Sequence, residues 1–371
     1  MSTNKETSFI KEPCADAFNI FEPIFKFKGI VTDQGSRIEN YINRPRFNRV
    51  NRAEQLKTVL ELRKQISRQG ISFKDKSEKT KEIFSKANNI FDEARQEDSL
   101  IKQYLNQRTI EITMPEIGTL SSKFTIIEPL TPSDQVPIFF IPGRGNDLDC
   151  VGSLLVELAK NGRKVICVAA PESYQGSTTK EFLGKLKHDY FYNNHKKFFK
   201  EALKAIVPDE KVELWSLSMG TGISQQLLLD KEIQYKVTKS TLICPTNLIE
   251  LNLPKFIAGC IKDYSLLLRK YSRIWPRWVF TIGKKENRNE IMNEDNKMIA
   301  IPFKRWSEIK TPLDIFIADK DGMTYGYLAD RTKIMKNQNI KTYLFPGIHE
   351  TPALNPKFLL KYINAHQKLN S

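Results

Sequence analysis

A serine on a sharp turn is the first residue in this sequence that could do chemistry. A run of strand-forming residues ends in the pentapeptide Ser216-Leu-Ser-Met-Gly220, and helix-compatible residues follow from Ile223. A serine forced onto a strand-to-helix turn takes a strained backbone conformation. Its neighbours must be small, because the strand and helix backbones nearly touch there. Ser218 is therefore the candidate nucleophile, and Gly220 and Gly222 keep the turn narrow.

A serine that cleaves an ester or amide needs three further groups. A base must take the hydroxyl proton, a carboxylate must hold the imidazole in the right tautomer, and two N–H donors must stabilise the oxyanion. The chain has four histidines. His188 and His195 lie in a long charged stretch that we expect to be a solvated helix face, and His366 lies in the C-terminal helix. His349 differs, because it lies in a loop directly after the last predicted strand.

The segments that must position these residues alternate between strand and helix. A predicted hairpin at 109–128 is followed by predicted strands at 136–141, 164–169, 212–215, 241–244, 313–318 and 341–345. Predicted helices lie at 151–161, 179–205, 223–230, 325–336 and 356–369. Such alternation indicates an α/β fold with a mostly parallel central sheet and helices on both faces.

The pentapeptide and the order of the flanking segments resemble the α/β-hydrolase superfamily over roughly residues 108–371. The resemblance implies that His349, in Phe345-Pro-Gly-Ile-His, is the base. It also implies that Asp321 is the acid, because the segment from Thr311 to Met323 resembles a family strand that ends in Gly-x-x-Asp, with Ala318 in place of the glycine.

Two other aspartates in the same segment are alternatives to Asp321. Asp319, two residues earlier, is the fallback acid, although Asp is also common as a turn-capping residue. Asp314 lies inside the predicted strand and is a poorer choice.

The same resemblance implies where the oxyanion donors lie. Pro142-Gly-Arg-Gly-Asn146 follows a buried strand at the place where relatives carry His-Gly-x. The backbone N–H groups of Arg144 and Met219 would then be the two donors, and the Arg144 side chain would add a cation at the mouth of the site. Pro142 in place of histidine and Ser216 in place of glycine depart from the family pattern.

Residues 251–305 interrupt the alternation, and the resemblance implies a helical cap over the active site. Apolar, aromatic and cationic residues in this segment favour an acyl or lipid-like substrate. Four residues are expected to contact the substrate: Gly143, Leu217, Trp275 and Trp278. Residues 1–107 are predicted to form a mainly helical N-terminal extension, which leaves 108–250 and 306–371 as the two parts of the core.

The composition excludes several other classes of protein. With 40% hydrophobic and 27% charged residues, the 371-residue chain is typical of a soluble globular protein. It has no apolar run of the roughly 20 residues that cross a bilayer and no apolar signal core, so we expect a cytoplasmic location. Neither metal-like spacing nor a dinucleotide-binding motif occurs, so no metal or cofactor is expected.

The net charge of +15 is spread along the chain without a polybasic run. We therefore expect no nucleic-acid partner, while peripheral contact with an anionic membrane stays open.

Three functions remain as hypotheses. The first is a serine hydrolase that cleaves an ester, thioester or amide through an acyl-enzyme. The second is an acyltransferase on the same fold, in which an alcohol or amine replaces water in the second step. The third is a non-catalytic binding protein that keeps the scaffold, and the departures at Ser216 and Pro142 favour it.

Overall fold

The computed structural model describes residues 105–263, 297–298 and 303–368. Short gaps within these ranges lie at residues 130, 132, 145–147, 174, 187–188, 190, 253, 257, 260–261, 350 and 355. The predicted N-terminal extension lies almost entirely outside the described residues. So does most of the predicted cap, including Trp275 and Trp278.

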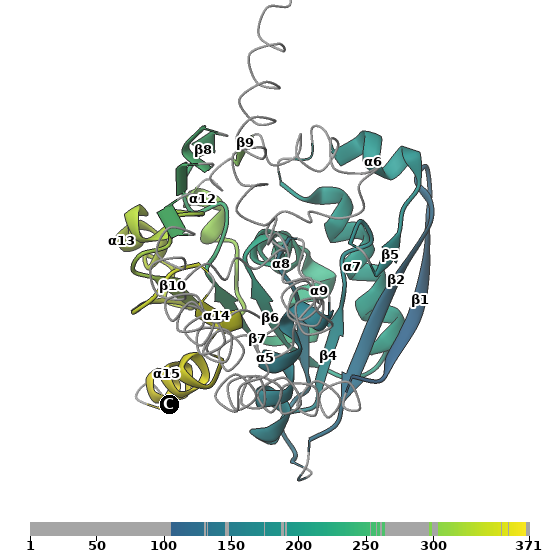
Figure 1. The fold of residues 1–371 in the computed structure, drawn as a ribbon, viewed down its shortest axis with the longest axis horizontal. Coiled ribbons are helices and arrows are strands. Elements are labelled where there is room, and N and C mark those ends of the chain that lie inside the picture. Colours follow the sequence, from purple (N-terminus) through teal and green to yellow (C-terminus); the bar gives the residue numbers. More distant parts are fainter. Residues whose placement is uncertain are drawn as a thin grey trace, which may run out of the picture.

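The described strands form one large mixed sheet and one small two-stranded sheet (Figure 1). Their bounds are β1 Gln107–Met114, β2 Gly118–Ile127, β3 Ile138–Ile141, β4 Val165–Val168, β5 Gly176–Ser177, β6 Val212–Leu217, β7 Val237–Ile243, β8 Leu251–Asn252, β9 Lys297–Met298, β10 Leu313–Ala318 and β11 Ile340–Phe345. The small sheet consists of β8 and β9.

The large sheet has the order β1-β2-β4-β3-β6-β7-β10-β11, with β5 paired to β2. All neighbours from β4 to β11 are parallel, whereas β2 is antiparallel to both β1 and β4. The predicted mostly parallel sheet with a leading hairpin is therefore confirmed. Because parallel strands end at the same edge, the loops after β6, β10 and β11 share one side of the molecule.

The described helices cover both faces of this sheet (Figure 1). Their bounds are α5 Leu148–Lys160, α6 Lys180–Leu186, α7 Asn193–Ile206, α8 Met219–Leu228, α9 Lys231–Lys236, α12 Phe303–Trp306, α13 Arg331–Ile334, α14 Thr351–Leu354 and α15 Pro356–Lys368, with a 3₁₀ helix η3 at Gly326–Leu328.

Successive side chains of a strand point to opposite faces, so one sheet contributes residues to two core layers. Ile138 and Phe140 of β3 pack in the layer that also holds α5 and α15. Their neighbours Phe139 and Ile141 pack in the opposite layer with α6, α7 and α8. A central strand must therefore be apolar throughout, and every residue of β3 is buried.

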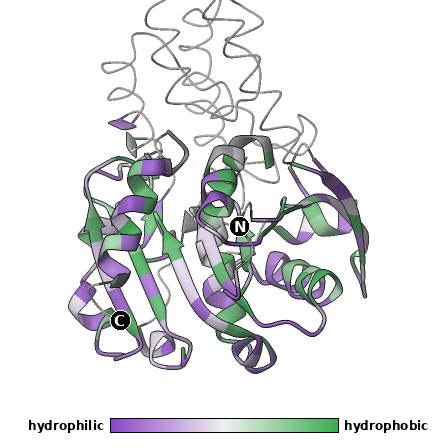
Figure 2. Ribbon diagram, turned by 90° about the horizontal axis from the view of Figure 1, so that it is seen from below, coloured by the Kyte–Doolittle hydropathy of each residue, from purple (hydrophilic) through white to green (hydrophobic). Residues whose placement is uncertain are grey.

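Figure 2 shows hydrophobic and hydrophilic bands interleaved along the outer helices, as expected of helices that pack one face on the sheet. The edge strand β1 also alternates, with Ile112 and Met114 buried and their neighbours exposed. Among the helices that the structure describes, none combines the length and the apolar character needed to cross a bilayer.

Three predicted elements differ from the structure. The single helix predicted at 179–205 is two helices, α6 and α7. The Asp189 side chain accepts the N–H groups of Asn193 and Asn194, at 2.7 and 2.6 Å, and so favours a new helix start. The helix predicted at 325–336 is only η3 and α13, and β7 starts earlier than predicted, at Val237.

Candidate active site

The turn between β6 and α8 holds Ser218 in a strained backbone conformation. Its φ of 53° and ψ of −123° lie where residues other than glycine are uncommon. Ser218 is the N-cap residue of α8, yet its side chain makes no capping hydrogen bond. The hydroxyl oxygen instead lies 2.8 Å from Nε2 of His349.

The small residues around Ser218 are required by close neighbours. A Cβ atom at Gly220 would lie 2.4 Å from the backbone oxygen of Ile141. At Gly222 it would lie 2.4 Å from the ring of Tyr192. Both distances are too short for a side chain, so the expectation that these glycines keep the turn narrow is confirmed.

Ser216, which stands in place of the glycine of the family pattern, is fully buried near the end of β6. Its hydroxyl finds no hydrogen-bond partner among the described residues.

The His349 ring bridges Ser218 and Asp321. Its Nδ1 lies 2.9 Å from Oδ2 of Asp321, opposite the nitrogen that faces the serine. Asp321 comes three residues after β10 and His349 comes four residues after β11, so the parallel strands deliver both loops to the edge at which β6 ends. The structure thus brings together the three side chains predicted as nucleophile, acid and base, which lie far apart in the sequence.

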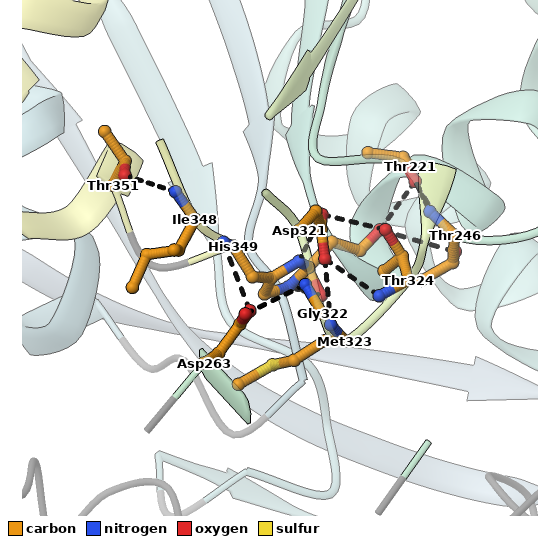
Figure 3. Close-up of polar contacts among 11 residues, drawn as sticks. Thr221, Thr246, Asp263, Asp321, Gly322, Met323, Thr324, Ile348, His349 and Thr351 are labelled. Atoms are coloured by element: carbon orange, nitrogen blue, oxygen red, sulfur yellow. Dashed lines mark hydrogen bonds and ion pairs between the residues drawn. The ribbon is translucent and has the colours of Figure 1, made fainter. Parts of the chain in front are cut away.

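The Asp321 carboxylate is buried and held by several donors (Figure 3). Oδ1 accepts the backbone N–H groups of Met323 and Thr324 at 3.0 and 2.8 Å, and the Thr324 hydroxyl donates to Oδ2 at 2.8 Å. Burial alone raises the pKa of the Asp321 carboxyl, but attraction to His349 and the Thr324 donors outweigh burial and hold the pKa below its ordinary value. An ionised Asp321 favours the His349 tautomer that carries its proton on Nδ1.

The two alternative acids lie elsewhere. Oδ1 of Asp319 accepts the N–H of Gly347 at 2.9 Å, so this carboxylate bridges the loops after β10 and β11 in an exposed position. Asp314 forms an ion pair with Lys239 at 2.8 Å. The described contacts of His349 therefore favour Asp321 over both.

The residues predicted as oxyanion donors lie at the ends of β3 and β6. Met219 is the first residue of α8, where a backbone N–H has no acceptor within the helix. Arg144 follows β3, and Gly143 before it is buried. The contact between Gly220 and Ile141 brings the start of α8 against the end of β3.

The Arg144 side chain does not form the expected cation at the mouth of the site. It is only 10% exposed, and its Nη1 lies 3.6 Å from Oε1 of Glu172. The same oxygen of Glu172 lies 3.0 Å from Nε2 of His195. Arg144, Glu172 and His195 therefore form a second buried charged group, which we call the Glu172 cluster.

The expectation that His195 lies on a solvated helix face is wrong. The residue is fully buried on α7, with the rings of Phe182 and Tyr192 packed edge-on against its imidazole. Burial alone raises the pKa of Glu172, but the attraction and hydrogen bond of His195 and the charge of Arg144 hold it below its ordinary value. The buried residues of α7 are His195, Phe198, Phe199, Ala202 and Leu203. This helical spacing was the signal in the sequence that His195 points inward.

The other predicted residues have varied surroundings. His366 stacks on Tyr362 in α15, and His188 lies outside the described residues. Leu217 is 3% exposed and packs in the core layer of α5 and α15, so its contact with a substrate stays a prediction. Sequence reasoning missed Asp263, a buried acid beside the loops of Asp321 and His349.

Cys244 adds a thiol sulfur to the carboxylate oxygen and the imidazole nitrogen of the site, so the three residues could be considered as metal ligands. The ligand atoms of Cys244, Asp321 and His349 lie within 4.8 Å of one another, close enough to hold a metal ion. Both ring nitrogens of His349 already face Asp321 and Ser218, and a metal ion would have to displace one of those bonds. The arrangement therefore fits a proton relay better than a metal site.

No protein-family model matches the sequence, and no curated protein matches it. Solved structures with a similar fold include a membrane phospholipase A, named as a novel bacterial virulence factor. It has a TM-score of 0.53 and 12% identity, and the match covers 74% of this chain and 90% of that one.

Two further solved structures have similar scores. A hydrolase from Pseudomonas aeruginosa PA01 has a TM-score of 0.52 and 13% identity, with 70% of this chain and 97% of that one covered. A serine hydrolase involved in carbazole degradation has a TM-score of 0.51 and 12% identity, with 71% and 99% covered. At these identities the similarity concerns the fold alone.

Proposed function

We propose that this chain, which has the α/β-hydrolase fold, is a serine hydrolase that cleaves an ester, thioester or amide through an acyl-enzyme. One observation carries the proposal. The His349 ring lies between the Ser218 hydroxyl and the Asp321 carboxylate, at 2.8 and 2.9 Å. Both distances are within hydrogen-bond reach, and the order of the three residues along the chain is the one that this fold uses.

In the first step, Ser218 Oγ attacks the carbonyl carbon of the substrate and His349 Nε2 takes the hydroxyl proton. The resulting imidazolium is stabilised by the buried carboxylate of Asp321, which holds Nδ1–H in place. Because the pKa of Asp321 lies below its ordinary value, the carboxylate stays ionised while the ring is charged. The same proton then passes from Nε2 to the leaving group.

The negative oxygen of the tetrahedral intermediate needs donors that point at it before the reaction begins. We assign this role to the backbone N–H groups of Arg144 and Met219, at the ends of β3 and β6. The Glu172 cluster supports the assignment, because the ion pair between the buried Arg144 side chain and Glu172 restrains the Arg144 backbone. Water, activated by His349, would then hydrolyse the acyl-enzyme.

An acyl or lipid-like substrate is the class that we favour. Residues 251–310 include Leu266, Trp275, Trp278 and several cations, which together suit an acyl chain beside an anionic head group. One structural neighbour is a phospholipase, an enzyme of this substrate class. A nitrophenyl ester series with acyl chains of increasing length would test it, because an apolar acyl site predicts a kcat/KM that rises with chain length.

The strained serine favours an enzyme over a non-catalytic binding protein. Holding Ser218 at a φ of 53° costs about 1–3 kcal/mol, and backbone strain of this kind clusters at functional sites. Acyl transfer differs from hydrolysis only in the acceptor. Product analysis with and without added alcohols or amines would separate these two activities.

A fluorophosphonate probe tests the nucleophile directly. The native chain should be labelled, and Ser218→Ala should abolish both labelling and ester hydrolysis. Ser216→Ala is the matched control, since it removes a hydroxyl two residues earlier in the same turn without touching His349. It should keep both activities within about two-fold, because its hydroxyl makes no described hydrogen bond. Labelling that survives in Ser218→Ala would show that the nucleophile is misassigned.

A further inference from the structure

A third buried carboxylate lies against the loops that carry the acid and the base. Asp263 belongs to the segment that follows β8, and its side chain is fully buried. It takes no part in the proton relay proposed above. A buried acid without a role in that relay needs its own physical explanation.

Both oxygens of Asp263 accept backbone N–H groups (Figure 3). Oδ1 accepts from Gly322 at 2.9 Å, and Oδ2 accepts from His349 at 3.4 Å. Gly322 directly follows Asp321, so one carboxylate binds the backbone beside the acid and the backbone of the base itself. These two loops are joined to different strands, β10 and β11, and Asp263 connects them from a third segment.

The backbone around Asp263 packs directly against the same loop. A Cβ atom at Gly259 would lie 1.5 Å from the backbone oxygen of Gly322. At Gly322 it would lie 2.7 Å from the backbone oxygen of Gly259 and 2.5 Å from Oδ1 of Asp263. Glycine at both positions permits this contact. A shift of the Asp263 segment must therefore shift the loop that carries Asp321.

We propose that Asp263 is a positioning residue whose carboxylate clamps the Asp321 and His349 loops together and so sets the alignment of His349 with Ser218. The inference rests on the proposed serine hydrolase function and adds a residue to it. Both hydrogen bonds of the clamp are accepted from backbone N–H groups, so it acts on the position of the two loops.

The charge state of the clamp follows from its neighbours. Burial and then the negative charge of Asp321 raise the pKa of Asp263 to about 7, although His349 and the two N–H donors favour the ionised form. The ammonium of the adjacent Lys262 lies over the rings of Tyr325 and Tyr327. Ionisation near neutral pH makes Asp263 a better acceptor but increases its repulsion of Asp321, so alignment should depend on pH.

The test compares Asp263→Ala and Asp263→Asn with Asp319→Ala. Asp319 is the matched control, because it also joins the two loops through a carboxylate and a backbone N–H, but in an exposed position. Asp263→Ala should lower kcat for a nitrophenyl ester by about 10- to 100-fold with little change in KM, since a small misplacement of reacting groups costs rate. Asp319→Ala should change kcat by less than about three-fold.

Asp263→Asn keeps one oxygen acceptor for Gly322 and cannot ionise. It should recover most of the activity lost in Asp263→Ala, and the inflection near pH 7 that ionisation of Asp263 gives to the kcat profile of the wild type should vanish. Circular dichroism and thermal melting of each variant separate misalignment from unfolding. If Asp263→Ala does not fold, the pH profile of Asp263→Asn alone tests the clamp.

Two results would overturn the clamp. One is a folded Asp263→Ala enzyme with the wild-type kcat, and the other is an Asp263→Asn profile identical to that of the wild type. Failure of the underlying function gives a different result, because the wild-type chain itself would then not react with the fluorophosphonate probe. A labelled wild type with an unaffected Asp263→Ala variant refutes the clamp only.

Discussion

Two buried histidines of this protein each face a buried carboxylate. His349 lies 2.9 Å from Asp321, and His195 lies 3.0 Å from Glu172. Attraction to its histidine helps to hold the pKa of each acid below the ordinary value. By burial, distance and electrostatics the two pairs are nearly alike.

The difference between the pairs lies in the third partner. The second ring nitrogen of His349 meets the Ser218 hydroxyl at the edge where β6 ends. The third partner of the Glu172 cluster is the Arg144 cation, and aromatic rings of Phe182 and Tyr192 pack around His195. A histidine–carboxylate pair is therefore not evidence of catalysis by itself. The pair becomes a candidate relay only where the second nitrogen of the histidine also faces a strained nucleophile.

The same substitution in each histidine should give the largest contrast. His349→Gln should lower ester hydrolysis by about 10⁴-fold or more, because glutamine cannot take up and return a proton. His195→Gln should lower the free energy of unfolding by about 1–3 kcal/mol through the altered buried hydrogen bond. Hydrolysis per folded His195→Gln molecule should stay within about ten-fold of wild type.

Steady-state kinetics and urea unfolding of the two glutamine variants supply both quantities. A fully folded His195→Gln protein without hydrolytic activity would contradict the distinction between the pairs.

Neutralising each carboxylate should give the next largest contrast. Asp321→Asn should lower kcat by about 10³- to 10⁴-fold, because the amide disfavours the required His349 tautomer. Glu172→Gln should instead lower the free energy of unfolding by about 3 kcal/mol, because it removes the buried negative charge that faces both Arg144 and His195. Thermal melting and steady-state kinetics of both variants test whether Asp321→Asn mainly lowers kcat and Glu172→Gln mainly lowers stability. Loss of stability in Asp321→Asn with unchanged kcat would reverse the assignment.

The smallest predicted effect is the pH dependence of stability. The pKa of Glu172 is lowered from its ordinary value of 4.5, so the ionised carboxylate stabilises the fold above that pH. This stabilisation is lost progressively as the pH falls below 4.5 and through the lowered pKa of the folded protein, because the unfolded chain then binds the proton more readily. The stability gap between wild type and Glu172→Gln should therefore narrow in acid. Melting temperatures between about pH 7 and pH 3 test it, and a constant gap would argue against an ionised Glu172.

Much of the fold could be read from the sequence, because its signals are local. Continuous apolar runs indicated strands buried on both faces, and β3 and β10 are such strands. The small residues Gly220 and Gly222 indicated a tight turn, and contacts with Ile141 and Tyr192 explain them. The predicted helix at 179–205 failed at its middle, because a capping side chain such as Asp189 can start a second helix within a polar stretch.

The candidate site was harder to predict from the sequence than the fold, and His195 and Asp263 show two reasons for this. His195 stands at the start of a buried stripe on α7, but charged neighbours hid this pattern. Asp263 had no signal, since its contact with His349 joins residues that are 86 positions apart in the sequence. No local pattern encodes such a meeting, which depends on how segments pack.

The amino-acid sequence by itself determined the α/β alternation and the strained turn at Ser218. These follow from backbone preferences and hydrophobic periodicity, which act over a few residues. The chain order of the candidate relay came from the resemblance to the α/β-hydrolase superfamily. Only the tertiary structure decided that His349 faces Ser218, that Arg144 pairs with Glu172 and that Asp263 accepts N–H groups from both loops. Those choices depend on burial and on the free energy of pairing charges in a low-dielectric interior, and both arise only when distant segments pack together.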